Sequence, residues 1–241
     1  MDNIKRICLW SGPRNISTAL MYSFAQRADT KVFDEPLYAY YLRHHPQAHT
    51  YHPGADIILE TMENDGEKVV EKMLNNTDKK VLFFKHMTHH LLGLSRSFMK
   101  QTINVILTRN PKDMLPSFDK VINNPTLNDV GYALHVELID YFKEHNIPFT
   151  VLDSKKVLLH PEMTLRKLCE FATIDFDKNM LSWQAQQLQE DGIWAKHWYS
   201  NVHKSTGFLK YKPKDSPFPK HLSLLLKECQ PYYNQLLEYS I

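Results

Sequence analysis

The sequence predicts an α/β fold of the three-layer sandwich type, in which a central and mostly parallel β-sheet lies between helices. Short apolar runs bounded by turn-forming residues recur along the chain, and segments with helical periodicity separate them. No linker rich in glycine, serine or proline divides the 241 residues, so we expect a single domain over residues 1–241. The predicted strands are Ile4–Trp10, Thr30–Phe33, Lys80–Lys85, Ile103–Thr108 and Phe149–Leu152.

The first predicted strand ends at a turn with the composition of an anion-binding loop. The turn contains Gly12 and Pro13 as breakers, the cation Arg14 and the hydroxyls of Ser17 and Thr18, and a helix over Ala19–Ala25 follows. Free N–H groups at a helix start, the helix dipole and a guanidinium all attract the same anion. The expected ligand is a phosphate or a sulfate. The nucleotide-binding pattern GxxxxGK[ST] is absent, because no Gly-Lys-Ser/Thr triplet closes the turn.

Polar residues directly follow the next two predicted strands. Glu35 comes after Thr30–Phe33, and His86 comes after Lys80–Lys85. The segment between these strands carries two predicted helices, Ile57–Met62 and Glu67–Asn75. Because ligands of parallel α/β sheets bind outside the carboxyl ends of the strands, we expect Glu35 and His86 to lie near the anion-binding loop.

The fourth predicted strand, Ile103–Thr108, brings a second cation to the same edge of the sheet. Arg109 follows it directly, and Ser117 lies further along in a predicted helix over Lys112–Val121. A guanidinium and a hydroxyl form a charge-assisted clamp, which a second phosphate remote from the first would need. The alternative is a surface arginine that pairs with Asp113.

The remaining segments are predicted to complete the sheet and cover it. A helix over Val130–His145 precedes the last strand, and Pro161 opens another helix. An amphipathic closing helix begins near Pro219 and is predicted to be interrupted at Pro231.

The composition of the chain limits the partners and the cellular compartment that we expect. The net charge of +2 does not indicate a nucleic-acid partner. The three cysteines have no CxxC spacing, which is typical of reduced thiols in a reducing compartment. We find neither the hydrophobic segment of a signal peptide nor a run of membrane-spanning length, and we expect a cytoplasmic protein without a membrane partner. Its oligomeric state is not predicted.

A metal site is not expected. His44-His45 and His89-His90 are adjacent pairs, whose side chains diverge on a helix or a strand. A site on one helix face favours a spacing such as i, i+4.

The turn after the first strand resembles a loop of the sulfotransferase family, Pro-Lys/Arg-Ser-Gly-Thr/Ser-Thr. That loop holds the 5′-phosphosulfate of 3′-phosphoadenosine-5′-phosphosulfate (PAPS). The resemblance implies a P-loop-like sheet and assigns the 5′ end of PAPS to Gly12, Pro13, Arg14, Asn15, Ile16, Ser17 and Thr18. Asn15 and Ile16 depart from the family's frequent Ser and Gly. If that Gly supplies a conformation open mainly to glycine, Ile16 strains or reshapes the loop.

Two later segments are also similar to this family. Arg109 and Ser117 match the arginine and serine that hold the 3′-phosphate of the nucleotide. Lys204 and Gly207 partly match a C-terminal loop that contacts the same phosphate. Both segments are therefore expected to bind PAPS, the implied co-substrate.

The chemistry that the resemblance implies is sulfuryl transfer without a metal. Such transfer requires in-line positioning and stabilisation of charge on the leaving phosphate, a role that we assign to Arg14. Removing the acceptor's proton requires a base, and two candidates remain open, Glu35 and His86. A carboxylate in a closed, partly apolar cleft has its pKa raised toward neutrality, which favours Glu35. Lys85 is a second cation for the sulfuryl oxygens.

The acceptor is expected to be a small molecule with a hydroxyl or an amine. Substrate choice is expected in three regions: Tyr38–Asp56, the helices after Lys85, and Trp183–Ser200. Two other functions stay open. One is a P-loop kinase or hydrolase, whose Gly-Lys-Ser/Thr loop is missing, and the other is a nucleotide-binding module with impaired turnover.

Overall fold

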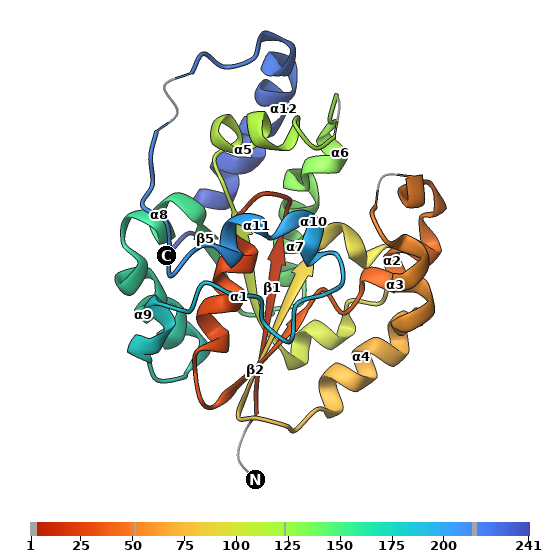
Figure 1. Ribbon diagram of the computed structural model, residues 1–241, viewed down its shortest axis with the longest axis vertical. Coiled ribbons are helices and arrows are strands. Elements are labelled where there is room, and N and C mark those ends of the chain that lie inside the picture. The colour runs from red at the N-terminus through yellow and green to blue at the C-terminus, as the bar shows by residue number, and fades with distance from the viewer. Residues whose placement is uncertain (1–3, 51, 123, 214–215) are drawn as a thin grey trace.

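The computed structural model describes residues 4–50, 52–122, 124–213 and 216–241, and these residues form a five-stranded parallel sheet flanked by helices (Figure 1). The order across the sheet is β2-β3-β1-β4-β5. Its strands are β1 (Lys5–Ser11), β2 (Thr30–Asp34), β3 (Val81–Met87), β4 (Ile103–Thr108) and β5 (Phe149–Asp153). The predicted α/β class is confirmed, and each predicted strand is present to within two residues.

The helices follow the alternating order expected of crossover connections. They are α1 (Ser17–Ala25), α2 (Tyr38–His44), α3 (Ala55–Thr61), α4 (Gly66–Asn75), α5 (Pro111–Phe118), α6 (Leu127–Val130), α7 (Tyr132–Glu144), α8 (Ser154–Leu159), α9 (Pro161–Ala172), α10 (Ala195–Trp198), α11 (Ser200–His203) and α12 (Ser223–Leu237). Short 3-10 turns are η1 (Pro46–Thr50), η2 (Thr88–Leu91), η3 (Ser97–Gln101), η4 (Lys178–Leu181) and η5 (Lys220–Leu222).

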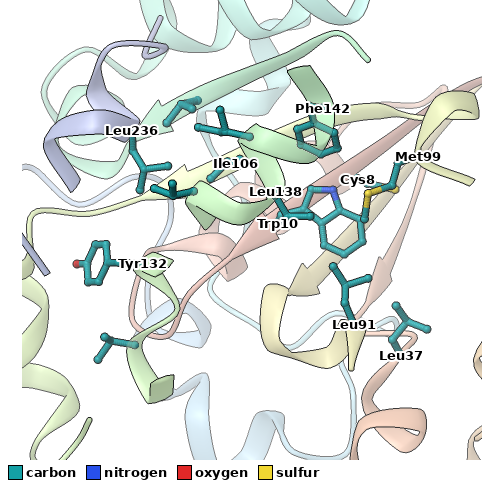
Figure 2. Close-up of a cluster of buried hydrophobic side chains, with 14 of the residues drawn as sticks. Cys8, Trp10, Leu37, Leu91, Met99, Ile106, Tyr132, Leu138, Phe142 and Leu236 are labelled. Atoms are coloured by element: carbon teal, nitrogen blue, oxygen red, sulfur yellow. The ribbon is translucent and has the colours of Figure 1, made fainter. Parts of the chain in front are cut away.

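Successive side chains of a strand point to opposite faces of the sheet, and here both faces are covered by apolar side chains. On β1, Cys8 and Trp10 face one cluster of apolar side chains, to which α4, α5, α7 and α12 contribute. Figure 2 shows part of this cluster, with Leu138 and Phe142 of α7 near Trp10. Ile7 and Leu9 face the second cluster, which is built with α1, α8 and α9. The molecule is thus a three-layer sandwich.

The strand order creates a crevice at the carboxyl edge of the sheet. The chain leaves β1 on one side, through β2 and β3, and then crosses to the other side for β4 and β5. In parallel α/β sheets, such a reversal leaves a ligand-binding crevice between neighbouring strand ends. The loops after β1, β3 and β4 therefore meet there.

Two helix predictions are corrected. The helix expected over Val130–His145 begins at Tyr132, because Gly131 has a left-handed backbone with φ of 79° that separates α6 from α7. The predicted interruption at Pro231 is wrong, since α12 continues through Pro231 to Leu237. Proline inside a helix costs about 3 kcal/mol. The burial of core side chains before and after it, such as Leu225 and Leu236, offsets that cost.

No helix in the described part of the chain combines the length and apolar character needed to cross a membrane. All three cysteines are buried free thiols.

Candidate active site

A cleft of about 1280 Å³ opens at the carboxyl ends of the strands. It brings together most of the residues that the sequence predicts for the site, namely Gly12, Pro13, Arg14, Asn15, Ile16, Ser17, Thr18, Glu35, Arg109, Ser117 and Gly207. Two predicted residues, His86 and Lys204, do not line it.

The loop after β1 adopts a strained conformation at the position where the sequence departs from the family pattern. Ile16 has φ of 65° and ψ of 17°, in the left-handed region that β-branched residues rarely adopt. Arg14 also has a positive φ, of 60°. Such residues cost of order 1–3 kcal/mol each and persist only where their surroundings hold them. Of the two outcomes considered for Ile16, strain or a reshaped loop, the left-handed backbone of Ile16 corresponds to strain.

Buried contacts from neighbouring strands hold this loop in place. The Asn15 side-chain amide donates to the carbonyl oxygen of Leu107 at 3.1 Å, and the Ser154 hydroxyl donates to the carbonyl oxygen of Asn15 at 2.8 Å. A Cβ on Gly12 would lie 2.8 Å from the carbonyl oxygen of Val130, so only glycine fits there. The loop is thus fixed from behind while its front faces the cleft.

The start of α1 is suited to an anion. Ile16 is its N-cap residue and provides no side-chain hydrogen bond, and no acidic residue lies in the first turn. The first N–H groups of the helix have no intrahelical partner, and they carry the positive end of its dipole. Ser17 and Thr18 add hydroxyls on the lining of the cleft.

Two guanidinium groups meet beside this helix start. Nε of Arg14 donates to Oγ of Ser117 at 3.2 Å, and Nη1 of Arg109 donates to the carbonyl oxygen of Arg14 at 2.9 Å. The Tyr132 hydroxyl donates to the carbonyl oxygen of Arg109 at 2.6 Å, which holds the end of β4. Burial and the nearby charge of Arg109 lower the pKa of Arg14. An arrangement that brings two cations together in a partly buried place favours a bound anion.

The C-terminal segment contributes different residues from those predicted. Lys204 is exposed and does not line the cleft, whereas Lys210 and Lys212 do. Gly207 lies at the wall, where a Cβ would come within 2.9 Å of the carbonyl oxygen of Leu181. The cationic character of this segment thus comes from lysines that follow the predicted one.

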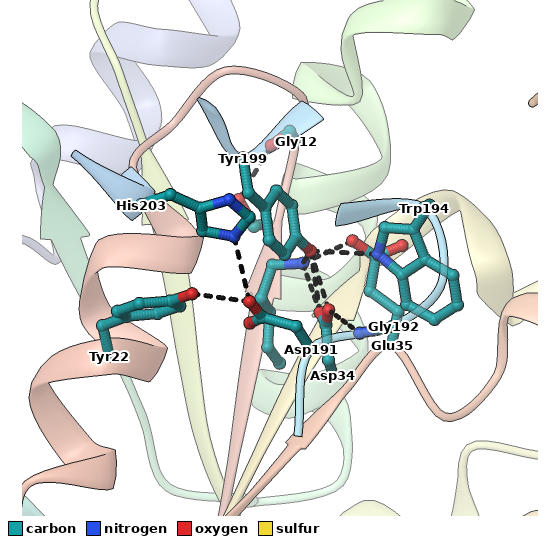
Figure 3. Close-up of polar contacts among 11 residues, drawn as sticks. Gly12, Tyr22, Asp34, Glu35, Asp191, Gly192, Trp194, Tyr199 and His203 are labelled. Atoms are coloured by element: carbon teal, nitrogen blue, oxygen red, sulfur yellow. Dashed lines mark hydrogen bonds and ion pairs between the residues drawn. The ribbon is translucent and has the colours of Figure 1, made fainter. Parts of the chain in front are cut away.

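A buried ammonium–carboxylate group forms the floor of the cleft (Figure 3). Nζ of Lys85 donates to Oδ1 of Asp34 at 2.8 Å, to Oε1 of Glu35, and to the hydroxyl of Tyr199 at 2.7 Å. The parallel pairing of β2 with β3 sets Asp34 opposite Lys85, so the contact follows from strand register. Glu35 has a positive φ of 48°, which turns the chain where β2 ends.

Burial shifts the acid–base behaviour of this group. Loss of solvent raises the pKa of Glu35, and the charge of Lys85 opposes that rise without cancelling it. For Lys85, burial by itself would lower the pKa, but the carboxylates of Asp34 and Glu35 hold it well above its usual value. A raised carboxyl pKa in a cleft is what general-base chemistry near neutral pH requires.

His86 belongs to the core and not to the cleft. Its ring stacks on Trp10 with centroids 4.4 Å apart, and it has no solvent exposure. Among the described residues, neither of its ring nitrogens has a hydrogen-bond partner. Burial, together with the charge of Lys85, lowers the pKa of His86 to about 3. Because Lys85 and His86 are consecutive on β3, they point to opposite faces of the sheet, and His86 cannot share the site of Lys85.

Aromatic side chains line the end of the cleft beyond Glu35. Two predicted acceptor regions contribute to it, residues 38–56 apart from residue 51, and residues 183–200. The lining includes Tyr38, Tyr41, His45, His52, Trp194 and Trp198, together with His89 and His90 from the turn after β3. The His90 ring stacks on both Tyr38 and Tyr41, at centroid distances of 4.9 and 4.7 Å.

The imidazoles of His52, His89 and His90 are neutral at physiological pH. Burial, reinforced by neighbouring histidines, lowers the pKa of His52 to about 4 and that of His89 to about 3. The pKa of His90 lies well below its usual value for the same reason. Within the described residues, no group of three or more His, Cys, Asp or Glu side chains is arranged to hold a metal ion.

Sequence reasoning missed Asp34, which lies behind the floor of the cleft, and it included Trp194 and Tyr199 only as members of the predicted acceptor region Trp183–Ser200. Asp34 carried a usable signal, since it lies at the end of the same strand that delivers Glu35. For Tyr199 the sequence indicated only this region, because the residue follows α10 in a segment without a motif and reaches Lys85 only through the fold.

Comparison with known proteins identifies relatives along most of the chain. Residues 5–238 match a family model described as Sulfotransferase domain. Two Arabidopsis thaliana proteins, named Branched-chain-amino-acid aminotransferase-like protein 1 and 2, are 41% identical over 229 residues, or 94% of this chain. This chain spans 40% of their length.

A solved structure supports the same fold. The sulfotransferase domain from the curacin biosynthetic pathway aligns with a TM-score of 0.57 over 99% of both chains, at 13% identity. At that identity the likeness concerns the fold alone, a central parallel sheet with flanking helices.

Proposed function

Because this chain belongs to the family described as Sulfotransferase domain, we propose that it transfers a sulfuryl group from PAPS to a hydroxyl or amine of a small-molecule acceptor. One observation carries the proposal. Two guanidinium groups and three hydroxyls line the same cleft as a buried carboxylate–ammonium pair. Arg14 lies at the uncapped start of α1 with Ser17 and Thr18 and donates to Ser117, and Arg109 donates to the backbone of Arg14.

We assign the two phosphate groups of the proposed ligand to different residues of this lining. The uncapped helix start, Arg14 and the hydroxyls of Ser17 and Thr18 would hold the 5′-phosphosulfate. Arg109 and Ser117 would hold the 3′-phosphate, and Lys210 or Lys212, which also line the cleft, would add charge. A nucleoside triphosphate has no 3′-phosphate, so this second site distinguishes the proposed ligand from ATP.

In the proposed mechanism, Glu35 accepts the proton of the acceptor's hydroxyl or amine. Burial raises its pKa, so its affinity for a proton exceeds that of an exposed glutamate. When bound, PAPS supplies an activated sulfuryl group. Arg14 would stabilise the negative charge on the leaving phosphate. Lys85, whose three donors are used by protein groups, would act on the sulfuryl oxygens through its positive charge alone.

The aromatic end of the cleft supports a small and uncharged acceptor. Its walls are phenol, indole and neutral imidazole rings, which offer stacking faces and hydrogen-bond acceptors. A small molecule held there would present its nucleophilic atom to Glu35. The cytoplasmic location stays a prediction, for which the buried free thiols are the supporting observation.

A second reading, nucleotide binding without turnover, has one observation in its favour. Ile16 strains the loop that would hold the 5′ end of the nucleotide. Product formation from PAPS separates the two readings. Turnover with any acceptor excludes the binding-only reading.

Calorimetric titration with adenosine 3′,5′-bisphosphate tests the proposed ligand, with ATP and adenosine 5′-monophosphate titrated in parallel. The proposal expects clear preference for the bisphosphate. Equal binding of ATP, or no binding of the bisphosphate, would overturn it.

A further inference from the structure

We infer that Asp34 and Tyr199 are positioning residues, which together fix the Lys85 ammonium against Glu35. Asp34 also holds the segment Asp191–Tyr199, which contributes Trp194, Trp198 and Tyr199 to the lining of the cleft. The inference rests on the proposed role of Glu35 as the base, and it extends that role to residues that come from two distant parts of the chain.

The Lys85 ammonium has no freedom to move without losing a hydrogen bond. A lysine has three N–H donors. All three are used here, by Oδ1 of Asp34 at 2.8 Å, by Glu35, and by the Tyr199 hydroxyl at 2.7 Å. The residue is 1% exposed, so water cannot replace a lost partner. Lys85 is therefore held at one point relative to Glu35.

Asp34 acts from behind the site. It does not line the cleft, so it has no direct access to a bound ligand. Both of its carboxylate oxygens accept from the Tyr199 hydroxyl, at 2.9 Å each, and Oδ2 also accepts from the backbone N–H of Gly192 at 3.0 Å. The Asp34 carboxylate thus holds both Lys85 and the segment Asp191–Tyr199.

Tyr199 links the same groups from the other side. Its hydroxyl accepts from Lys85 and from the indole N–H of Trp194, at 3.0 Å, and donates to Asp34. The hydroxyl is fully occupied by protein groups, which argues for a positioning role rather than direct contact with a substrate.

Asp34 and Tyr199 have opposite effects on Glu35. The negative charge of Asp34 competes for Lys85 and disfavours a second negative charge on Glu35, whereas the Tyr199 hydroxyl favours it. The charged or titratable groups that face Glu35 are Asp34 of β2, Lys85 of β3, Tyr38 of α2 and Tyr199. His86 and His90 also lie near Lys85, and both are neutral. The pKa of Glu35 is therefore subject to two opposing effects. A variant at Asp34 or at Tyr199 removes one of them and leaves the other.

Carboxyl NMR of protein labelled with 13C at the glutamate side-chain carboxyl measures this balance directly. The Glu35 signal is assigned by its loss in Glu35→Gln, and its titration midpoint is followed with pH. We expect Asp34→Asn to lower the midpoint and Tyr199→Phe to raise it, each by about 1 pH unit. A purely structural role would give no such pair of opposite shifts, so shifts in the same direction, or none, would overturn the inference.

Tyr22→Phe is the matched control. The Tyr22 hydroxyl donates to Asp191 at 2.6 Å, so this variant also removes a tyrosine contact to the same segment. Tyr22 does not line the cleft, and the Glu35 midpoint should stay unchanged. If Asp34→Asn does not fold, as judged by thermal unfolding, Tyr199→Phe decides alone: a raised midpoint supports the inference, and an unchanged one overturns it.

Binding of adenosine 3′,5′-bisphosphate separates this inference from the proposed function. Both positioning variants should keep the wild-type Kd to within about twofold, because neither residue contacts the proposed phosphate sites. Absence of binding by the wild-type protein would contradict the proposed function, while the NMR titration would still decide the positioning roles.

Discussion

Nε of Arg14 donates a hydrogen bond to Oγ of Ser117 at 3.2 Å, across a sequence separation of 103 residues. The contact joins the loop after β1 to helix α5, which follows β4. Arg109 reinforces it by donating to the carbonyl oxygen of Arg14. The two proposed phosphate sites are therefore joined by hydrogen bonds, and we expect a substitution in one site to affect anion binding in the other.

Arg109→Ala is expected to weaken binding of adenosine 3′,5′-bisphosphate sharply. The variant removes a charged hydrogen-bond donor and the contact that holds the Arg14 backbone. Hydrogen bonds to charged groups contribute about 1.5–3 kcal/mol, so calorimetry should give a Kd about 10–100-fold higher. Lys204→Ala is the control, because this exposed lysine lies outside the cleft, and its Kd should match the wild type. If Lys204→Ala raises the Kd more than Arg109→Ala does, Lys204 contacts the nucleotide as the sequence predicted.

Glu35→Gln is expected to remove turnover while leaving bisphosphate binding near normal. The amide keeps the shape of the side chain but cannot accept the acceptor's proton at neutral pH. General-base catalysis contributes typically 10²–10⁴-fold, so the rate of sulfuryl transfer from labelled PAPS should fall by about that factor. The acceptor for this assay is found first by screening the wild-type protein. Unchanged turnover would exclude Glu35 as the base.

Ile16→Gly is expected to give a more stable protein than Ile16→Ala. Both variants lose the packing of the isoleucine side chain, but only glycine adopts φ of 65° without strain. The free energy of unfolding in urea should differ by about 1 kcal/mol in favour of the glycine variant. Equal stability would mean that the loop relaxes to another conformation when the isoleucine is removed.

His86→Phe is expected to make stability less sensitive to acid. The pKa of His86 is about 3 in the folded protein, against about 6.5 in an unfolded chain. Between these values the unfolded state binds a proton that the folded state excludes, so the wild type loses stability as pH falls through this window. Phenylalanine keeps a ring against Trp10 and binds no proton.

Urea unfolding at pH 7.5 and pH 5 measures this effect. Relative to the wild type, the His86→Phe variant should gain about 2 kcal/mol on moving to pH 5. His135, whose pKa is about 4 because of burial, is present in both proteins and cancels in the comparison. A stability difference that does not change with pH would contradict the prediction.

The amino-acid sequence by itself determined the sheet and the residues at its carboxyl edge. Buried strands are short runs of apolar and β-branched residues, and this is a local property that can be read along the chain. Parallel strands then bring their carboxyl ends to one edge, so Arg14, Glu35 and Arg109 could be expected in one cleft.

The error at His86 came from a strand boundary. The predicted strand stopped at Lys85, which left His86 free to turn into the site, whereas β3 continues to Met87. Once both residues belong to one strand, alternation sends them to opposite faces. Likewise, Pro231 marked a helix end by local rules, but core packing on both sides of it carries α12 onward.

Only the tertiary structure decided which side chains complete the site. Tyr199 reaches Lys85 across 114 residues of sequence, and Asp34 holds both through contacts that no motif records. Lys210 and Lys212, and not Lys204, line the cleft because of the path that the chain takes after α11. Such contacts depend on where a loop passes over the sheet. That path is set by the burial of distant side chains, while local sequence preference sets only the strands and helices beneath it.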